Sequence, residues 1–328
     1  TWEKKLSYNV GFDFSMWNGK LSMEVDAFYN YVYDMLTAQG SGFPPSMGGY
    51  YFNSANVNEV DYKGFDLTLS HHNTVGDFFY SMKLIWSYTY GRWLKYAGDS
   101  GNTPDYQRLT GKQIGSKIGL VDDGLFQTWE EIENSATDLT RPSYPGYIKY
   151  VDMNGDGTIT AEGDRANLGK CVPSWTFGFN AGFDWKGIDF SMVWQGVAGN
   201  KIFDATRRTD IPTMNQPKYV LNRWTGEGST NEYPRFTVTD PNQNWSKASD
   251  FFIKDASYFR LKNVTLGYTL PAKWTNKVFV KKLRVYVACE NALTFTKYDG
   301  FDPEIADYVD RGIYPQSRTV QFGASITF

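Results

Sequence analysis

Cysteine, histidine and long apolar runs are scarce in this sequence, and each scarcity removes a class of protein. Two cysteines cannot build a disulfide framework, and the adjacent pair His71 and His72 cannot complete a Cys/His zinc site. The longest uninterrupted apolar run is the five residues from Val285 to Cys289, whereas an α-helical membrane span needs about 20. The G-x-S-x-G, Walker and H-E-x-x-H motifs are also missing, so the sequence indicates no enzyme class.

An excess of charge of one sign is missing as well. The chain has 33 Lys and Arg against 36 Asp and Glu, whereas a nucleic-acid-binding surface needs a clustered basic excess. What is abundant is aromatic side chains, which make up 17% of the 328 residues. Disordered chains are poor in aromatic residues, so these rings indicate a folded protein.

Strict alternation of apolar and polar residues decides the fold class. In the segment 175–185 the odd positions are all apolar, and the even positions are all small or polar. Successive side chains of a β-strand point to opposite faces, so this segment is a strand with one apolar and one polar face. The pattern predicts nine strands, at 6–16, 21–35, 57–71, 77–93, 174–185, 188–197, 256–270, 281–294 and 317–328. Most have the length of about 9–11 residues with which a tilted strand crosses a bilayer.

The connections between these strands alternate between short and long. They run 17–20, 36–56, 72–76, 94–173, 186–187, 198–255, 271–280 and 295–316. Outer-membrane barrels have short periplasmic turns and longer extracellular loops, whereas a large soluble β-sandwich has no reason to place every long loop at one end. The sequence therefore predicts an all-β, transmembrane antiparallel β-barrel, with His71 and His72 in a periplasmic turn.

The same alternation predicts which charged side chains face lipid and which face the lumen. Arg260 and Lys262 share their parity with Val264 and Leu266, so we expect them on the lipid side, above the hydrocarbon or snorkelling toward water. Seven other charged positions within strands fall on the lumen parity: Glu24, Asp26, Asp66, Lys83, Asp184, Arg284 and Glu290.

Nine strands do not close a barrel of this kind. Bacterial single-chain barrels have an even number of strands, and an open edge in lipid would leave backbone groups unpaired at several kcal/mol each. We therefore expect an N-terminal portion upstream of this sequence.

A set of motifs in the second half of the chain is specific to one family. It includes Tyr150–Thr160 with Asp164-Arg165, the stretch Ser257–Pro271, Asn291–Thr296, Tyr298–Pro303 and the terminal Phe328. In this order the motifs resemble the C-terminal part of a SusC/RagA-type TonB-dependent transporter of Bacteroidota.

The resemblance implies a location, partners and a function. It implies the last nine strands of a 22-stranded outer-membrane barrel, with residues 1–328 as the C-terminal portion and a plug domain upstream. TonB would act through that missing N-terminal part, and a SusD-like surface lipoprotein would form a lid. The implied function is active uptake of a bulky ligand, a glycan fragment or a peptide, across the outer membrane. The alternatives are a calcium-dependent carbohydrate-binding or adhesive surface β-protein without transport, and a passive porin.

One loop follows the spacing of a calcium site. Asp152, Asn154 and Asp156 fit positions 1, 3 and 5 of the D-x-N-x-D-G pattern, and the Thr158 carbonyl fits position 7. Position 12, normally a carboxylate, is a glycine, so Asp164 would have to reach in from position 13. The open alternatives are a bound calcium ion that stiffens the loop and a tight Asx/Gly turn without metal.

Aromatic residues of the long loops and the last residue are further candidates. Three alternatives are open for the loop rings, namely stacking on sugars, contact with the lid, and small cores of the loops themselves. These rings are Trp129, Tyr144, Tyr147, Trp224, Tyr233 and Trp245. Phe328 ends an alternating strand, which resembles the barrel-assembly signal of outer-membrane proteins. Cys171 and Cys289 are not expected to pair.

Overall fold

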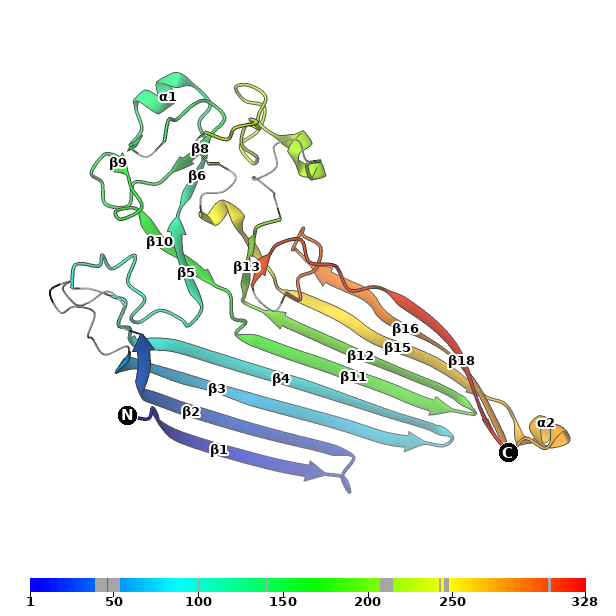
Figure 1. Cartoon of the computed structure of the whole chain (residues 1–328). Coiled ribbons are helices and arrows are strands. Elements are labelled where there is room, and N and C mark those ends of the chain that lie inside the picture. Colours follow the sequence, from blue (N-terminus) through cyan, green and yellow to red (C-terminus); the bar gives the residue numbers. More distant parts are fainter. Residues whose placement is uncertain are drawn as a thin grey trace.

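A single nine-stranded antiparallel sheet dominates the computed structural model, which describes residues 1–38, 46, 54–99, 101–139, 141–206, 215–241, 243–244, 248–305 and 308–328. Neighbouring strands of the sheet are also neighbours along the chain (Figure 1), which confirms the predicted strand number and order. The strands are β1 (Lys4–Met16), β2 (Leu21–Ala38), β3 (Ser54–Val75), β4 (Phe78–Lys95), β11 (Trp175–Trp185), β12 (Ile188–Ala198), β15 (Tyr258–Thr269), β16 (Lys282–Thr296) and β18 (Thr319–Thr327).

The sheet has one apolar and one polar face, because the register keeps like residues side by side. Phe179, for example, lies between Leu84 and Trp194, and the next residue, Asn180, lies beside Lys83. The apolar face stays uncovered: Val10 is 76% exposed and Phe322 is 83% exposed. Such a face needs an apolar solvent, so we call it the outer, lipid-facing face and the polar one the inner face.

Aromatic rings form two bands on the outer face. The upper band lies near the extracellular ends of the strands and contains Phe65, Trp86, Tyr88 and Trp175, with 4.3 Å between the ring centroids of Tyr88 and Trp175. The lower band contains Phe78, Tyr80, Phe183 and Phe190. Two levels of rings match the two interfaces of a bilayer.

The long connections lie at one end of the sheet and the short ones at the other (Figure 1). The short end includes α2 (Ala272–Thr275) between β15 and β16. The prediction that His71 and His72 form a turn is wrong: β3 continues to Val75, His71 pairs with Met82, and the turn lies at Gly76, whose φ is +61°. No helix among the described residues has the length and apolarity needed to cross a membrane.

The lipid-facing assignment of Arg260 and Lys262 is also wrong. A β-bulge leaves Lys262 without a register partner between Leu261, which pairs with Trp194, and Asn263, which pairs with Val193. The extra residue reverses the alternation above it, so that Phe259 and Leu261 face outward. Arg260 lies on the inner face beside Thr294 and Gln195 and is only 4% exposed. The alternation of residues along the sequence does not reveal this reversal, because a bulge adds one residue to the strand without a recognisable sequence signal.

The long connections fold into small sheets above the main one. In the connection between β4 and β11, β5 (Ser116–Leu120) pairs with β10 (Arg165–Lys170), β6 (Asp122–Leu125) with β8 (Ile148–Tyr150), and β7 (Thr137–Asp138) with β9 (Thr158–Ile159). A second group joins β13 (Lys201–Asp204), β14 (Ile253–Asp255) and β17 (Val309–Asp310). Each group encloses a core of its own, one around Leu120 and Ile148 and one around Ile202 and Tyr298.

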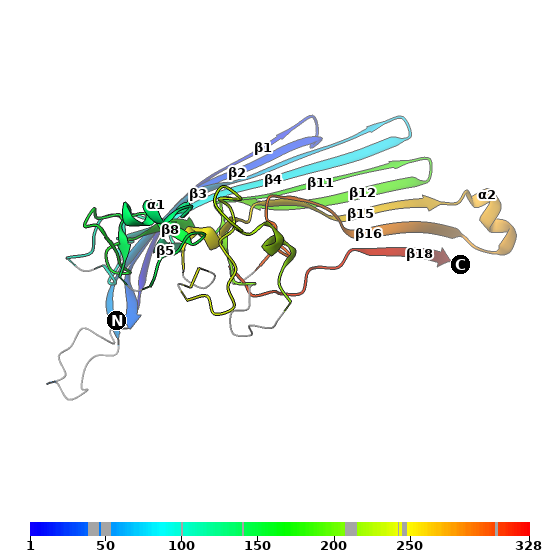
Figure 2. The same ribbon diagram turned by 90° about the horizontal axis from the view of Figure 1, so that it is seen from above.

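The two edge strands of the main sheet, β1 and β18, do not pair with each other. Figure 2 shows the sheet as a bowed wall with these two strands at opposite margins. The described chain therefore forms part of the wall of a barrel.

Candidate functional site

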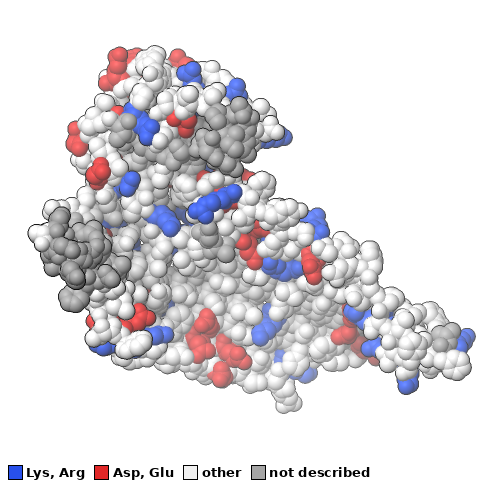
Figure 3. All heavy atoms as spheres, in the orientation of Figure 1, with Lys and Arg blue, Asp and Glu red and all other residues white. Residues whose placement is uncertain are grey.

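The inner face of β1, β2 and β3 concentrates negative charge. The register places Asp13 opposite Glu24 and Asp26 opposite Asp66, and we call these four residues the acidic inner patch. Figure 3 shows acidic side chains gathered over this part of the sheet. Like charges opposite each other destabilise a sheet, and none of the four has an ion-pair partner among the described residues. This charge is thus a property of the inner surface and does not hold the strands together.

Further along the sheet the inner face carries a cross-strand ion pair. Arg284 of β16 reaches over β15 to Asp189 of β12, and its Nε donates to Asp189 Oδ1 at 2.8 Å. Gly267 of β15 lies beneath the pair: a Cβ there would lie 2.5 Å from Arg284 Nη2 and from both Asp189 carboxylate oxygens. The glycine leaves the space in which the two side chains meet.

A buried ionic network ties the connection 297–318 to the inner face of β15. Arg260 donates to Asp302 Oδ1 at 2.7 Å, to Glu304 Oε2 at 2.9 Å and to Thr294 Oγ1 at 3.0 Å. Lys262, the bulged residue, donates to the same Glu304 oxygen at 2.7 Å. The Arg260 and Asp302 side chains are each 5% exposed, so removal of either partner would strand a buried charge.

The environment of Asp302 favours its ionised form. Burial alone would raise the pKa of this carboxyl group, but the Arg260 guanidinium and the backbone N–H groups of Glu304 and Gln316 outweigh burial and hold the pKa below its usual value. Asp302 lies within the motif Tyr298–Pro303, to which the sequence alone assigns no role. No local pattern links Asp302 to an arginine 42 residues earlier.

Three of the predicted loop rings lie together near α1 (Trp129–Glu133). Tyr144 makes edge-to-face contacts with both Trp129 and Tyr147, each with 5.5 Å between ring centroids. Trp129 is 57% exposed and Tyr144 is 39% exposed, whereas Tyr147 is buried. The cluster therefore offers two rings to a ligand or a partner, and the third supports them from below.

The other predicted rings belong mainly to the interior of the loops. Trp224 packs against the core around Leu120 and donates its indole N–H to Gln127 at 2.9 Å. Tyr233 stacks on Tyr219 with 5.2 Å between centroids. Trp245 lies outside the described residues. For Trp224 the structure thus shows the small-core role that the sequence left open.

The Asp152 loop is closed by hydrogen bonds from its own backbone. Asp152 accepts from the N–H groups of Gly155 and Gly157, Asn154 accepts from that of Asp156, and Asp156 accepts from Thr158. The bonds from the Thr158 hydroxyl, the Asn154 amide and the Thr158 backbone lower the pKa of Asp156.

Asp164 stabilises this loop through hydrogen bonds from the loop backbone. Its carboxylate is fully buried and accepts from the N–H groups of Met153 at 2.9 Å and Thr160 at 2.7 Å. The described residues contain no group of three or more His, Cys, Asp and Glu side chains placed to hold a metal ion. The oxygens of Asp152, Asn154 and Asp156 are of the kind that calcium prefers, but Asp164 is directed to the backbone, so calcium binding stays a prediction.

Two carboxyl groups that the sequence did not single out meet in the loop region. Asp122 of β6 and Asp250 lie side by side, and the Asp122 N–H donates to Asp250 Oδ1 at 2.7 Å. Burial, the hydrogen bond that protonated Asp122 donates to the Asp250 carboxylate and the negative charge of that carboxylate raise the pKa of Asp122 to about 6. The two positions are 128 residues apart, so only the fold reveals the pair.

Phe328 and the cysteines lie where strand parity puts them. Phe328 follows β18 at the short-turn end and is 77% exposed. Cys289 pairs with Val264 and Val320 on the outer face, whereas Cys171 is buried in the loops, and both are free thiols. The role of Phe328 as an assembly signal stays a prediction.

The nine-strand wall with its two faces can be compared with known proteins. The family model described as TonB dependent receptor-like, beta-barrel matches residues 1–292. The chain belongs to the TonB-dependent receptor-like β-barrel family. This membership places it in the outer membrane, in agreement with the apolar outer face and the two aromatic bands, and it confirms the resemblance seen in the sequence.

Relatives within this family align along the whole chain. TonB-dependent receptor P26 of Formosa agariphila is 29% identical over 100% of this chain and 35% of its own length. TonB-dependent receptor SusC of Bacteroides thetaiotaomicron is 23% identical over 100% of this chain and 32% of its own. The solved RagAB peptide importer in its open-open state superposes with a TM-score of 0.76 at 23% identity, over 100% of this chain and 35% of that one. The chain thus spans about a third of the length of the relatives that it matches.

Proposed function

We propose that this chain forms part of an outer-membrane importer that takes up a bulky ligand, an oligosaccharide or a peptide, in a TonB-dependent step. The observation that carries the proposal is the charged inner face of a lipid-exposed wall, in a member of the TonB-dependent receptor-like family. A hydrophilic cargo needs such a polar wall to cross an apolar membrane. The chemistry of the described residues is that of binding and passage, so we propose no enzymatic step.

The proposed importer has parts outside this sequence. Further strands would pair with β1 and β18 and complete a barrel of 22 strands, and a plug domain upstream would receive the pull of TonB. A SusD-like lipoprotein would cover the extracellular loops. Among the predicted contact residues we assign the ligand or the lid to Trp129 and Tyr144, because these two rings are exposed at the loop surface.

Uptake of labelled ligand by intact cells tests this proposal. We expect cells that carry the full-length gene to accumulate a labelled oligosaccharide or oligopeptide, and cells that lack TonB to accumulate neither. W129A/Y144A should lower uptake several-fold through lost ring contacts, whereas L139A, at an exposed apolar position of the same connection, should not. Accumulation that persists without TonB would contradict energised import.

A calcium-dependent carbohydrate-binding or adhesive role without transport is the second candidate. It is favoured by the Asp152 loop, whose oxygen-rich turn lies on the extracellular side. On this alternative, cells would bind a labelled glycan at their surface with or without TonB, a chelator would release it, and no label would enter. Import predicts internal label that depends on TonB.

A further inference from the structure

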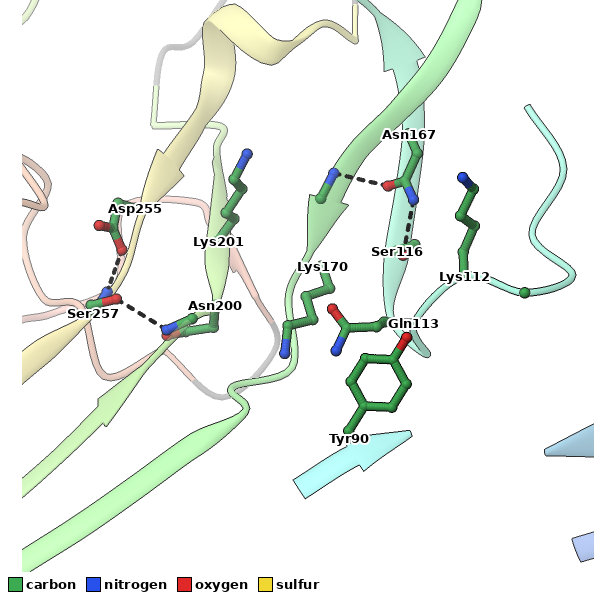
Figure 4. Close-up of a pocket in the computed structure, with 13 residues that line it drawn as sticks. Tyr90, Lys112, Gln113, Ser116, Asn167, Lys170, Asn200, Lys201, Asp255 and Ser257 are labelled. Atoms are coloured by element: carbon green, nitrogen blue, oxygen red, sulfur yellow. Dashed lines mark hydrogen bonds between the residues drawn. The ribbon is translucent and has the colours of Figure 1, made fainter. Parts of the chain in front are cut away.

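A hollow lined by three lysines lies where the main sheet gives way to the loops. It has a volume of about 580 Å³ and lies between the extracellular ends of β4 and β12 and the loop strand β10 (Figure 4). The side chains that matter for its chemistry are those of Tyr90, Lys112, Gln113, Lys170, Lys201 and Asp255.

The hollow belongs to the outer face of the barrel wall. Tyr90 pairs with Lys63 and follows Trp86 and Tyr88 of the upper aromatic band on the same side of β4. A Cβ on Gly199, which lines the hollow, would lie 3.8 Å from Cδ1 of Trp175, another ring of that band. The hollow therefore lies directly above the rings that mark the extracellular interface of the membrane, at the level of lipid headgroups.

Within the described residues none of the three lysines forms an ion pair, although Asp255 lies opposite Lys201 in the register of β13 and β14. Lys170 donates to the hydroxyl of Ser174, Lys201 donates to the carbonyl of Leu168 at 2.9 Å, and Lys112 makes no side-chain hydrogen bond or ion pair within the described part of the chain. Asp255, the one acidic residue named in the lining, accepts the N–H of Ser257 at 2.9 Å.

A fourth cation stands beside the opening. The Lys63 ammonium lies 5.3 Å from the centroid of the Tyr90 ring, and Lys63 is exposed. Burial lowers the pKa of Lys170, whose ammonium donates to the Ser174 hydroxyl and forms no ion pair among the described residues. An anion that entered the hollow would meet several cations in a space partly screened from water, where ionic contacts are stronger than at an open surface.

We propose that this hollow binds the phosphate group of an anionic outer-leaflet lipid headgroup. Three observations support the assignment: the outward position above the aromatic band, the lysines without an ion pair in the described chain, and a volume that accepts a phosphorylated sugar-sized headgroup. Lysine clusters next to a membrane surface attract anionic lipids, each charge adding to the affinity. The inference concerns the lipid side of the wall and is independent of what the barrel imports.

Retention of lipid by the full-length protein tests the proposal. The protein is exchanged into phosphatidylcholine nanodiscs doped with lipid A, and bound lipid A is measured by native mass spectrometry. The variant K112Q/K170Q/K201Q is expected to lose affinity on the order of a hundredfold, since each lysine near a lipid surface contributes about a factor of five. The charge-matched control K273Q/K277Q/K281Q, at exposed positions of the opposite end, should retain the lipid.

A second variant separates binding from folding. Lys112→Gln removes a side chain without hydrogen-bond or ion-pair partners in the described residues, so it should leave the heat resistance of the barrel unchanged and weaken lipid A binding about fivefold. Equal retention of lipid A by the wild-type protein and both hollow variants overturns the proposal. Inorganic phosphate that displaces lipid A at equal concentration also overturns it, because the hollow would then be a site for a free anion.

Discussion

At the scale of single residues, the inner face depends on glycines where neighbouring atoms come closest. A Cβ on Gly64 of β3 would lie 2.0 Å from the backbone oxygen of Tyr88 and 2.8 Å from Cζ of Phe28. A backbone atom cannot swing away as the end of a long side chain can. Gly178 of β11 differs, since its nearest neighbour would be a backbone oxygen at 3.5 Å, an ordinary contact distance.

Gly64→Ala should therefore destabilise the barrel, and Gly178→Ala should be tolerated. The crowded substitution must displace β4 relative to β3, and such overpacking costs about 1–3 kcal/mol. The temperature at which the full-length protein loses its compact, fast-migrating form on a gel measures the effect. A loss of the same size in both variants would contradict the geometric argument.

The carboxyl pair of Asp122 and Asp250 predicts a pH dependence of the loop region. The pKa of Asp122, about 6, lies above the value of about 3.9 of an unfolded aspartate, so the folded loops bind its proton more tightly. The stability that this proton provides is fully present below about pH 4 and is lost as the pH rises through about 6. Asp250→Asn keeps an acceptor for the Asp122 N–H and removes the like charge but not the burial of Asp122, so it should reduce this loss.

Limited proteolysis of the full-length protein between pH 4 and 7 is the measurement. The wild-type loops should be cut faster as the pH approaches 7, after correction for the intrinsic pH dependence of the protease, and those of Asp250→Asn should show a smaller increase. Asp105→Asn, at an exposed carboxylate in the same long connection, is the control and should behave as the wild type.

At the scale of elements, the alternation of side chains made most of the sheet predictable. Phe179 beside Asn180, repeated along nine segments, indicated the strands, their faces and the ends at which the loops lie. What alternation could not reveal is the bulge at Lys262, because an inserted residue resets the count. Contacts such as that of Arg260 with Asp302 were equally hidden, because they join segments whose separation only the fold fixes.

Deletion of Lys262 should be far more damaging than Lys262→Ala. Deletion removes the bulge and turns the upper part of β15 over, so that Phe259 would enter the polar inside and Arg260 would lose Asp302. Lys262→Ala keeps the register and removes one bond to Glu304. The yield of heat-resistant barrel in outer membranes measures the difference, and equal yields would show that the bulge has no structural role.

The protease sensitivity of the Asp152 loop in calcium and in chelator distinguishes a bound ion from a loop that is held by its own hydrogen bonds. If calcium binds, D152A/D156A should raise the protease sensitivity of the connection between β4 and β11 more in calcium than in chelator, because the loss of the backbone hydrogen bonds to these two carboxylates acts under both conditions. Asp164→Asn should raise it under both conditions, because Met153 and Thr160 donate to different oxygens of the carboxylate and an amide replaces one of these oxygens with an NH2 donor. An identical digestion pattern of the wild type with and without chelator would exclude a stabilising ion.

At the scale of the whole molecule, the unpaired edges of the strands β1 and β18 determine whether residues 1–328 can fold by themselves. β1 and β18 each offer one edge without a partner in the main sheet, and in lipid every unpaired backbone group costs several kcal/mol. Residues 1–328 expressed with an export signal should therefore fail to yield a heat-resistant barrel, whereas the full-length protein should yield one. A closed, protease-resistant barrel from residues 1–328 alone would show that the two margins can join.

The small sheet of β13, β14 and β17 has a consequence for the order of assembly. In the chain, β13 follows β12, β14 directly precedes β15, and β17 lies between β16 and β18. These three strands can therefore meet only when the strands of the main sheet have reached their final register. Pairings between such distant segments form late in folding, because the intervening chain must be ordered first. The time at which this extracellular sheet becomes resistant to added protease would thus report when the transmembrane sheet has finished folding.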